Sequence, residues 1–195
     1  MSSDKKQQLI QAGIELFHRR GFWNTSTASI AKHANVATGT LFNYFPSKES
    51  LIDEVYLHIK TQLLEELSSS LLQLGEQQKA QPVIETLWYR YISWGVGNPI
   101  EHDLLNQLKL SDLVSKEAQD RSMASFSEFH QYMQNWLGSG ELKAMDTGYF
   151  AELMMAQMQV NINYAIAQDL ADMALAKHVL LGFAVFWDGI KASSD

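Results

Sequence analysis

Apolar residues recur every three or four positions along most of this chain, the spacing that places them on one face of an α-helix. The first such stretch covers residues 4–20 and ends at Gly21. Two short stretches follow, one after Ser26, a candidate N-cap, and one from about residue 37 to the position before Pro46. Ser47 then caps a long helix that ends near Gly75 or in the polar segment after it. The N-terminal part therefore predicts four helices, of which the second and third are short.

The rest of the chain shows the same periodicity. A polar segment from Gly75 to Pro82 separates it from the N-terminal helices, and no long run of β-branched residues alternates with polar ones. The pattern predicts an all-α fold of about nine helices. The five further helices are expected at residues 82–96, 99–110, 116–137, 147–168 and 172–191.

The three N-terminal helices follow the order of a helix-turn-helix unit. Asn35 lies between the second and third helices, and Asn accepts the left-handed backbone of a tight turn better than most residues. Short helices do not stand alone in water, so these must share a core. We expect a helix-turn-helix domain at 1–50, connected by the helix at about 47–74 to a second domain at 51–195. The expected core residues are Leu16, Phe17, Phe22, Ile30, Ala31, Val36, Leu41 and Phe45.

Composition and charge narrow the possible classes of protein. The chain has no cysteine, which excludes disulfides, thiolate zinc sites and cysteine nucleophiles. Its N-terminus has no signal-peptide pattern, and no uninterrupted apolar run approaches the roughly 18 residues of a membrane span, so we expect a cytoplasmic protein. The net charge is −7, yet residues 1–50 carry six basic and three acidic side chains. A basic end on an acidic body can orient a protein on a polyanion.

Residues 21–51 contain a Gly-Phe pair, Thr-Ser, Ile-Ala, Gly-Thr-Leu, Tyr-Phe and Ser-Lys-Glu in this order. With these motifs the stretch resembles the DNA-binding domain of the TetR/AcrR family of regulators. The resemblance covers roughly residues 5–55 and also fits the chain length and the helical remainder. Asn35, Ala37 and Phe42 depart from the family pattern, which has Gly, Ser and more often Tyr at these places, and Gly13 replaces a usual Ala. The matching residues are Gly21, Phe22, Thr25, Ser26, Ile30, Ala31, Ala34, Val36, Gly39, Thr40, Leu41, Tyr44, Phe45, Ser47, Lys48, Glu49 and Leu51.

This resemblance implies a third helix that enters the DNA major groove. Thr40 and Asn43 are then suited to base edges, Phe42 to a thymine methyl, and Gly39 to close approach of the backbone. Thr25, Tyr44 and Lys48 are suited to phosphates. The full expected DNA-binding set is Thr25, Ser26, Thr38, Gly39, Thr40, Phe42, Asn43, Tyr44 and Lys48.

The family resemblance also implies that the last two helices form a four-helix interface with a second subunit. The last helix is apolar on most sides and must be covered on most sides. A single-chain core without a dimer is the alternative. The residues expected at the dimer interface are Met155, Ile162, Val179, Phe183, Phe186 and Ile190.

The second domain is rich in aromatic residues and methionine, which suit an adaptable apolar pocket. The resemblance implies an effector cavity there, and we expect a small apolar or aromatic effector. A packed core without a cavity explains the same residues. The expected lining is Trp88, Tyr91, Trp94, Phe126, Phe129, His130, Met133, Met154, Met158 and Asn161.

Nothing in the sequence indicates an enzyme, a cofactor or a metal site. Glu15 and His18 form one Glu-x-x-His motif, but a di-iron bundle site needs two such motifs and two further glutamates. No Gly-rich phosphate loop or nucleophile elbow is present. We therefore expect a homodimeric, ligand-responsive regulator that binds double-stranded operator DNA, most simply as a repressor. The alternatives are a transcriptional activator and a helical interaction protein that does not bind DNA.

Overall fold

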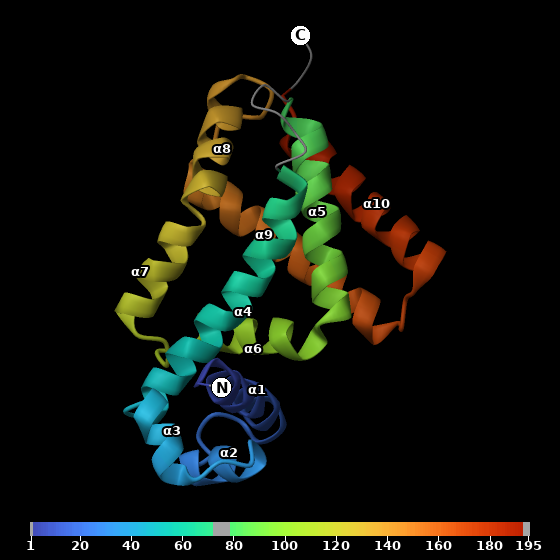
Figure 1. Cartoon of the computed structure of the whole chain (residues 1–195). Helices are drawn as coiled ribbons and strands as arrows, with labels where there is room; N and C mark the ends of the chain where they lie inside the picture. The colour runs from blue at the N-terminus through green and yellow to red at the C-terminus, as the bar shows by residue number, and fades with distance from the viewer. Residues whose placement is uncertain (1, 72–78, 193–195) are drawn as a thin grey trace. The chain divides into compact units, whose positions relative to one another are not determined.

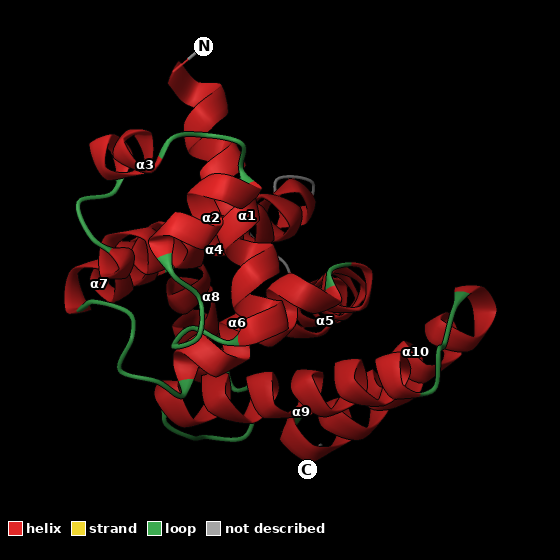
Figure 2. Cartoon of the chain, turned by 90° about the horizontal axis from the view of Figure 1, so that it is seen from below, coloured by secondary structure: helices red, strands yellow, loops and turns green. Residues whose placement is uncertain are grey.

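The computed structural model describes residues 2–71 and 79–192. Within these ranges every secondary-structure element longer than a single β-bridge is an α-helix (Figures 1 and 2). This all-α architecture confirms the fold class that the periodicity predicts. The expected end of the fourth helix near Gly75 lies outside the described residues. The helices are α1 (Ser2–Arg20), α2 (Thr27–His33), α3 (Thr38–Tyr44), α4 (Lys48–Leu71), α5 (Ala80–Gly97), α6 (Pro99–Lys109), α7 (Lys116–Ser125), α8 (Ser127–Gly138), α9 (Thr147–Ala167) and α10 (Asp172–Ile190).

One predicted helix is two helices in the structure. The sequence predicts a single helix at 116–137, whereas α7 ends at Ser125 and α8 begins at Ser127. Phe126 between them has φ −99° and ψ 12°, outside the helical range. Serines flank this residue on both sides, and serine hydroxyls compete with the helical hydrogen bonds of the backbone. Apolar periodicity continues across the break, which is why the sequence pattern does not reveal it.

The described chain divides into two compact units. The first unit comprises residues up to Gln62 together with Asn98–Ala124, and thus holds α1, α2, α3, the first part of α4, α6 and α7. The second comprises the other described residues and holds the end of α4, α5, α8, α9 and α10. The sequence does not indicate that α6 and α7 pack with the N-terminal helices.

The core of the first unit is built from the apolar faces of its short helices. Phe17 and Phe22 bring their rings to 4.9 Å between centroids and close the turn after α1. Every expected core residue of the helix-turn-helix is buried except Val36, which is half-buried. Because α2 and α3 have only seven residues each, this shared core is what keeps them folded.

In the second unit, α5, α9 and α10 pack against one another around Trp88. This indole is fully buried, stacks on Phe186 at 5.0 Å between ring centroids, and donates a hydrogen bond from Nε1 to the carbonyl of Val179 at 3.1 Å. Gly182 on α10 lies directly against Asn161 on α9, since a Cβ built on Gly182 would come 2.1 Å from Oδ1 of Asn161. The two C-terminal helices therefore approach each other closely.

Candidate nucleic-acid interface

The turn between α2 and α3 has the geometry that the sequence predicts. Ser26 caps α2, because its hydroxyl accepts a hydrogen bond from the backbone N–H of Ser29 at 3.1 Å. Asn35 has φ 55°, the left-handed conformation expected of it. Ala37 stands at the start of α3 and provides no side-chain cap. The turn thus has one well-capped helix before it and one uncapped helix after it.

The side chains of α3 divide into an inner and an outer face. Leu41 is fully buried in the first unit, and Phe45, directly after the helix, is 1% exposed. Phe42 is 46% exposed although its ring is apolar. The expected DNA-binding residues of this helix are all at least partly accessible: Thr38, Gly39, Phe42 and Asn43 are exposed, and Thr40 and Tyr44 are half-buried.

Two of the expected phosphate contacts have roles inside the protein. The hydroxyl of Thr25 is buried and is directed at the carbonyls of Leu16 and Gly21, at 3.2 and 2.8 Å. The ammonium of Lys48 donates a hydrogen bond to the carbonyl of Phe22. An ammonium has three N–H groups, so Lys48 keeps two for other acceptors, whereas Thr25 has its single donor engaged within the domain. Contacts of either residue with DNA stay predictions.

The first turn of α4 is also held by side chains. Ser47 accepts a hydrogen bond at its hydroxyl from the backbone N–H of Ser50 at 3.1 Å, and Ser50 returns one to the backbone carbonyl of Ser47 at 2.8 Å. The pKa of Glu49 is lowered, chiefly by a hydrogen bond from its own backbone N–H and further by the Ser47 hydroxyl. The predicted cap at Ser47 is confirmed, and it fixes the direction in which α4 leaves α3.

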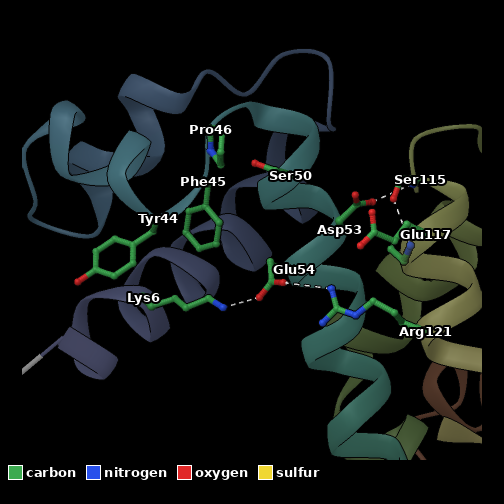
Figure 3. A pocket seen from close by; sticks show the side chains of 11 residues that line it. Lys6, Tyr44, Phe45, Pro46, Ser50, Asp53, Glu54, Ser115, Glu117 and Arg121 are labelled. Atoms are coloured by element: carbon green, nitrogen blue, oxygen red, sulfur yellow. Dashed lines mark hydrogen bonds and ion pairs between the residues drawn. The ribbon is translucent and has the colours of Figure 1, made fainter. Parts of the chain in front are cut away.

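A polar pocket of about 260 Å³ lies within the first unit, between α1, the end of α3, α4 and α7 (Figure 3). Glu54 on α4 binds Lys6 of α1 at 2.6 Å and lies 3.8 Å from Arg121 of α7. Asp53, one residue earlier, accepts a hydrogen bond from the backbone N–H of Ser115 at 2.8 Å. Two neighbouring carboxylates of α4 therefore tie α1 and α7 to the helix that follows α3.

The expected effector-pocket residues fall into three groups by exposure. Trp88, Tyr91, Trp94, Met158 and Asn161 are buried in the second unit. Phe126, Phe129, Met133 and Met154 are half-buried, and His130 is exposed. The contacts of Trp88 are those of a packed core residue. This agrees, for Trp88, with the alternative interpretation of these aromatics, a packed core without a cavity.

Tyr91 differs from its buried neighbours. It is 6% exposed, its ring centroid lies 6.3 Å from that of Trp94, and burial raises its pKa above the usual range of a phenol. Its hydroxyl has no hydrogen-bond partner among the described residues. A buried hydroxyl without a partner is unfavourable by about 1–3 kcal/mol, which sets Tyr91 apart from Trp88, whose N–H has an acceptor.

The six residues expected at a dimer interface lie mostly inside their own chain. Ile162, Val179, Phe183, Phe186 and Ile190 are 0–4% exposed, and Met155 is half-buried. Their apolar area is already covered by α5, α9 and α10, so they have almost none to offer to a second subunit. The exposed apolar residues of the same two helices are different ones: Tyr149, Val160, Tyr164 and Ile166 on α9, and Met173, Leu180, Leu181 and Val185 on α10.

Two further properties of the described residues bear on function. By length and composition, α10 is the one helix here that could cross a membrane, but one such helix is weak evidence and its inner face packs on α5 and α9. Within 2–71 and 79–192, no group of three or more His, Asp or Glu side chains is placed to hold a metal ion. Glu15 and His18 of the Glu-x-x-His motif instead pair with His33 at 2.7 Å and Asp103 at 3.1 Å.

Comparison with known proteins relates both the helix-turn-helix and the whole fold to regulators. Residues 9–55 match the family of bacterial regulatory proteins called the tetR family. Over 67 residues the chain is 43% identical to the HTH-type transcriptional regulator LuxR of Vibrio harveyi, a match that covers 34% of this chain and 33% of that regulator. The chain thus spans about a third of the length of the curated relative.

Solved structures extend the similarity to the full chain. A tetR family transcription regulator from Shewanella sp. PV-4 superposes with a TM-score of 0.85 at 27% identity, over 97% of this chain and 99% of the other. The transcriptional regulator FadR from Bacillus subtilis, whose structure is a complex with stearoyl-CoA, has the same fold with a TM-score of 0.71 at 18% identity, over 94% and 98%. Residues 9–55 therefore match the tetR family of bacterial regulatory proteins, and the full chain shares the fold of a regulator from that family.

Proposed function

We propose that this protein is a ligand-responsive transcriptional regulator that binds operator DNA as a homodimer and acts as a repressor. The observation that carries the proposal is the two-sided character of α3. Its inner residues lie in a rigid core, and its outer face presents Thr38, Gly39, Phe42 and Asn43 to solvent. A helix with small and polar residues outward and a capped partner helix beside it is suited to the major groove.

Dimerisation is part of this proposal, because one α3 reads too few base pairs for a specific site. The exposed apolar residues of α10 recur at positions 173, 180, 181 and 185, and those of α9 at 149, 160, 164 and 166. Since α9 and α10 pack together, these residues are suited to a two-fold interface of four helices. This face replaces the buried residues that the sequence suggests.

The dimer can be tested with one charged residue in this face. We expect Leu181→Glu, at a side chain that is 65% exposed, to give a folded monomer in sedimentation velocity. Leu110→Glu, at an 88% exposed leucine of the first unit, is the matched control and should leave the dimer intact. A dimer that persists in Leu181→Glu and in Leu181→Glu/Val185→Glu would contradict the proposed interface.

For the effector we propose a small molecule that is mainly apolar and carries a hydrogen-bond acceptor. The buried hydroxyl of Tyr91 supports the acceptor, since a phenol whose pKa is raised stays protonated and donates. The stearoyl-CoA bound by the B. subtilis protein of the same fold is an example of this chemistry. Effector and operator would favour different shapes of the dimer, so each should weaken binding of the other.

Tyr91→Phe separates an effector contact from a packing role. The variant removes only the hydroxyl, so the protein without effector should be as stable or about 1 kcal/mol more stable. Its thermal shift with acyl-CoA or other apolar probes should be smaller than that of the unaltered protein. An equal thermal shift in both proteins would contradict the role of the Tyr91 hydroxyl.

Binding to DNA is tested by fluorescence anisotropy with a duplex selected from a random pool. Thr40→Ala and Asn43→Ala should lower the preference for the selected duplex over a scrambled one, each by about 1–3 kcal/mol if the side chain reads a base. Their stability should be unchanged, because Asn43 is exposed and Thr40 is half-buried. If the unaltered protein binds no duplex at low salt, the proposal is wrong and a helical interaction protein is the better description.

A further inference from the structure

Trp23 is the most exposed aromatic side chain among the described residues, with 82% of its surface open to solvent. It lies in the turn between α1 and α2, which belongs to the helix-turn-helix domain. The other described tryptophans are buried or half-buried, as is usual for so large an apolar ring. Because the indole is exposed at this place, Trp23 is a candidate for contact with a ligand.

The turn that carries Trp23 is held in place on both sides. Gly21 takes φ 77°, and its N–H donates to the carbonyl of Phe17 at 2.8 Å. Phe22 is buried against Phe17, and the hydroxyl of Thr25 lies 2.8 Å from the Gly21 carbonyl. Trp23 therefore projects from a rigid turn, which lowers the backbone entropy that would be lost on binding.

The surroundings of Trp23 are those expected beside a phosphate backbone. The ammonium of Lys48 binds the carbonyl of Phe22, so this cation lies at the residue next to Trp23. Arg19 and Arg20 precede the turn and are exposed, while Glu49, exposed beside Lys48, is the acidic group on the adjoining turn of α4. Ser26, three residues after Trp23, is the N-cap of α2. In a helix-turn-helix the first helix crosses the DNA backbone, and its preceding turn is close to the phosphates.

We propose that Trp23 is a further DNA-binding residue, which packs its ring on a deoxyribose and donates its Nε1–H to a phosphate oxygen. An indole N–H is a donor only, which fits a phosphate, and the apolar ring fits the sugar face. The contact is to the backbone, so Trp23 contributes affinity and orientation without reading the base sequence. This inference rests on the proposed binding of operator DNA.

The inference is tested with Trp23→Ala and Trp23→Phe on a labelled duplex selected from a random pool. Trp23→Ala should raise the Kd about tenfold, and Trp23→Phe, which keeps a ring but loses the donor, about threefold. The slope of log Kd against log salt should be unchanged, because a neutral side chain releases no counterion, whereas Lys48→Ala should reduce it. Tyr89→Ala, at a 48% exposed aromatic of the second unit, is the control and should leave the Kd unchanged.

The native indole also reports on its own contact. Subtracting the emission spectrum of Trp23→Phe from that of the unaltered protein isolates the emission of Trp23. This emission should shift in wavelength or lose intensity when the duplex is added. A Trp23→Ala protein that binds DNA within twofold of the unaltered protein would overturn the inference, as would a change in its oligomeric state that accounts for the weaker binding. If the unaltered protein binds no duplex, the proposed function itself fails, and the inference falls with it.

Discussion

The helix-turn-helix and the pair α9–α10 are both helical and apolar, but they differ in how clearly their residues define a face. In α3, buried Leu41 is flanked by accessible Thr40 and Phe42, and small or polar residues fill most of the outer face. In α10, Phe183 is 4% exposed while Leu181 and Val185 are 65% and 61% exposed, and all three are apolar. A polar outer face, rather than a high apolar content, therefore makes the buried side of a helix recognisable in its sequence.

The largest effect is expected from truncating the inner face of the helix-turn-helix. Phe45→Ala removes a side chain that is 1% exposed and should lower the free energy of unfolding in urea by about 3–5 kcal/mol. Phe42→Ala, on the outer face at 46% exposure, should change it by less than about 0.5 kcal/mol. Similar losses of stability from both variants would contradict the two-sided description of α3.

The close approach of α9 and α10 predicts a smaller effect. Gly182→Ala adds a methyl group that would meet the amide of Asn161, which is itself buried and donates to the carbonyl of Gln157 at 2.8 Å. We expect a net loss of about 1–2 kcal/mol, since overpacking outweighs the better helix propensity of Ala. Gly189→Ala on the same helix has nothing within 4 Å and should be neutral or stabilising. Equal thermal unfolding of the two variants would mean that the helices are not in close contact.

The starts of α2 and α3 differ by one hydroxyl, which gives a matched pair of variants. Ser26→Ala removes the cap of α2 and should lower stability by about 1 kcal/mol, whereas Ala37→Ser supplies the missing cap of α3 and should raise it by up to about the same amount. Chemical denaturation of both proteins measures the changes. A destabilising Ala37→Ser would show that the start of α3 needs the alanine for another reason.

A pH-dependent effect on stability is expected from Lys60 on α4. Burial, and to a lesser degree the charge of Lys109, lowers its pKa to about 8. Its unfolded value is higher, near 10.5, so the unfolded chain binds more protons between these two pH values and stability should rise with pH across that window. Thermal unfolding from pH 7 to 9.5 should show this rise in the unaltered protein and a flatter profile in Lys60→Met. Identical profiles in the two proteins would contradict the burial of this charge.

The sequence predicts the N-terminal helices almost residue by residue, because each break there has a chemical mark. Ser26 and Ser47 start helices with their hydroxyls, and Asn35 takes the left-handed turn. The break at Phe126 has no such mark beyond the flanking serines, so α7 and α8 merge into one predicted helix.

Other features depend on contacts between distant parts of the chain. The salt bridge of Glu54 with Lys6 joins residues 48 positions apart, and the bond from Ser115 to Asp53 spans 62 positions, so no local pattern indicates them. Which face of α10 is buried depends on which of its apolar residues contact Trp88, and therefore on how α5 packs against α10. Trp23 is marked in the sequence only as a tryptophan in a turn, and its exposure is evident only in the fold.

We propose above that the outer face of α3 reads DNA in a two-fold symmetric dimer. Selection of bound duplexes from a random pool by the full-length protein tests it most directly. We expect an enriched pseudo-palindrome whose half-sites are about one helical turn apart or somewhat more, and whose base preferences change in Thr40→Ala and Asn43→Ala. No enrichment, or an asymmetric sequence that both variants select unchanged, would contradict it.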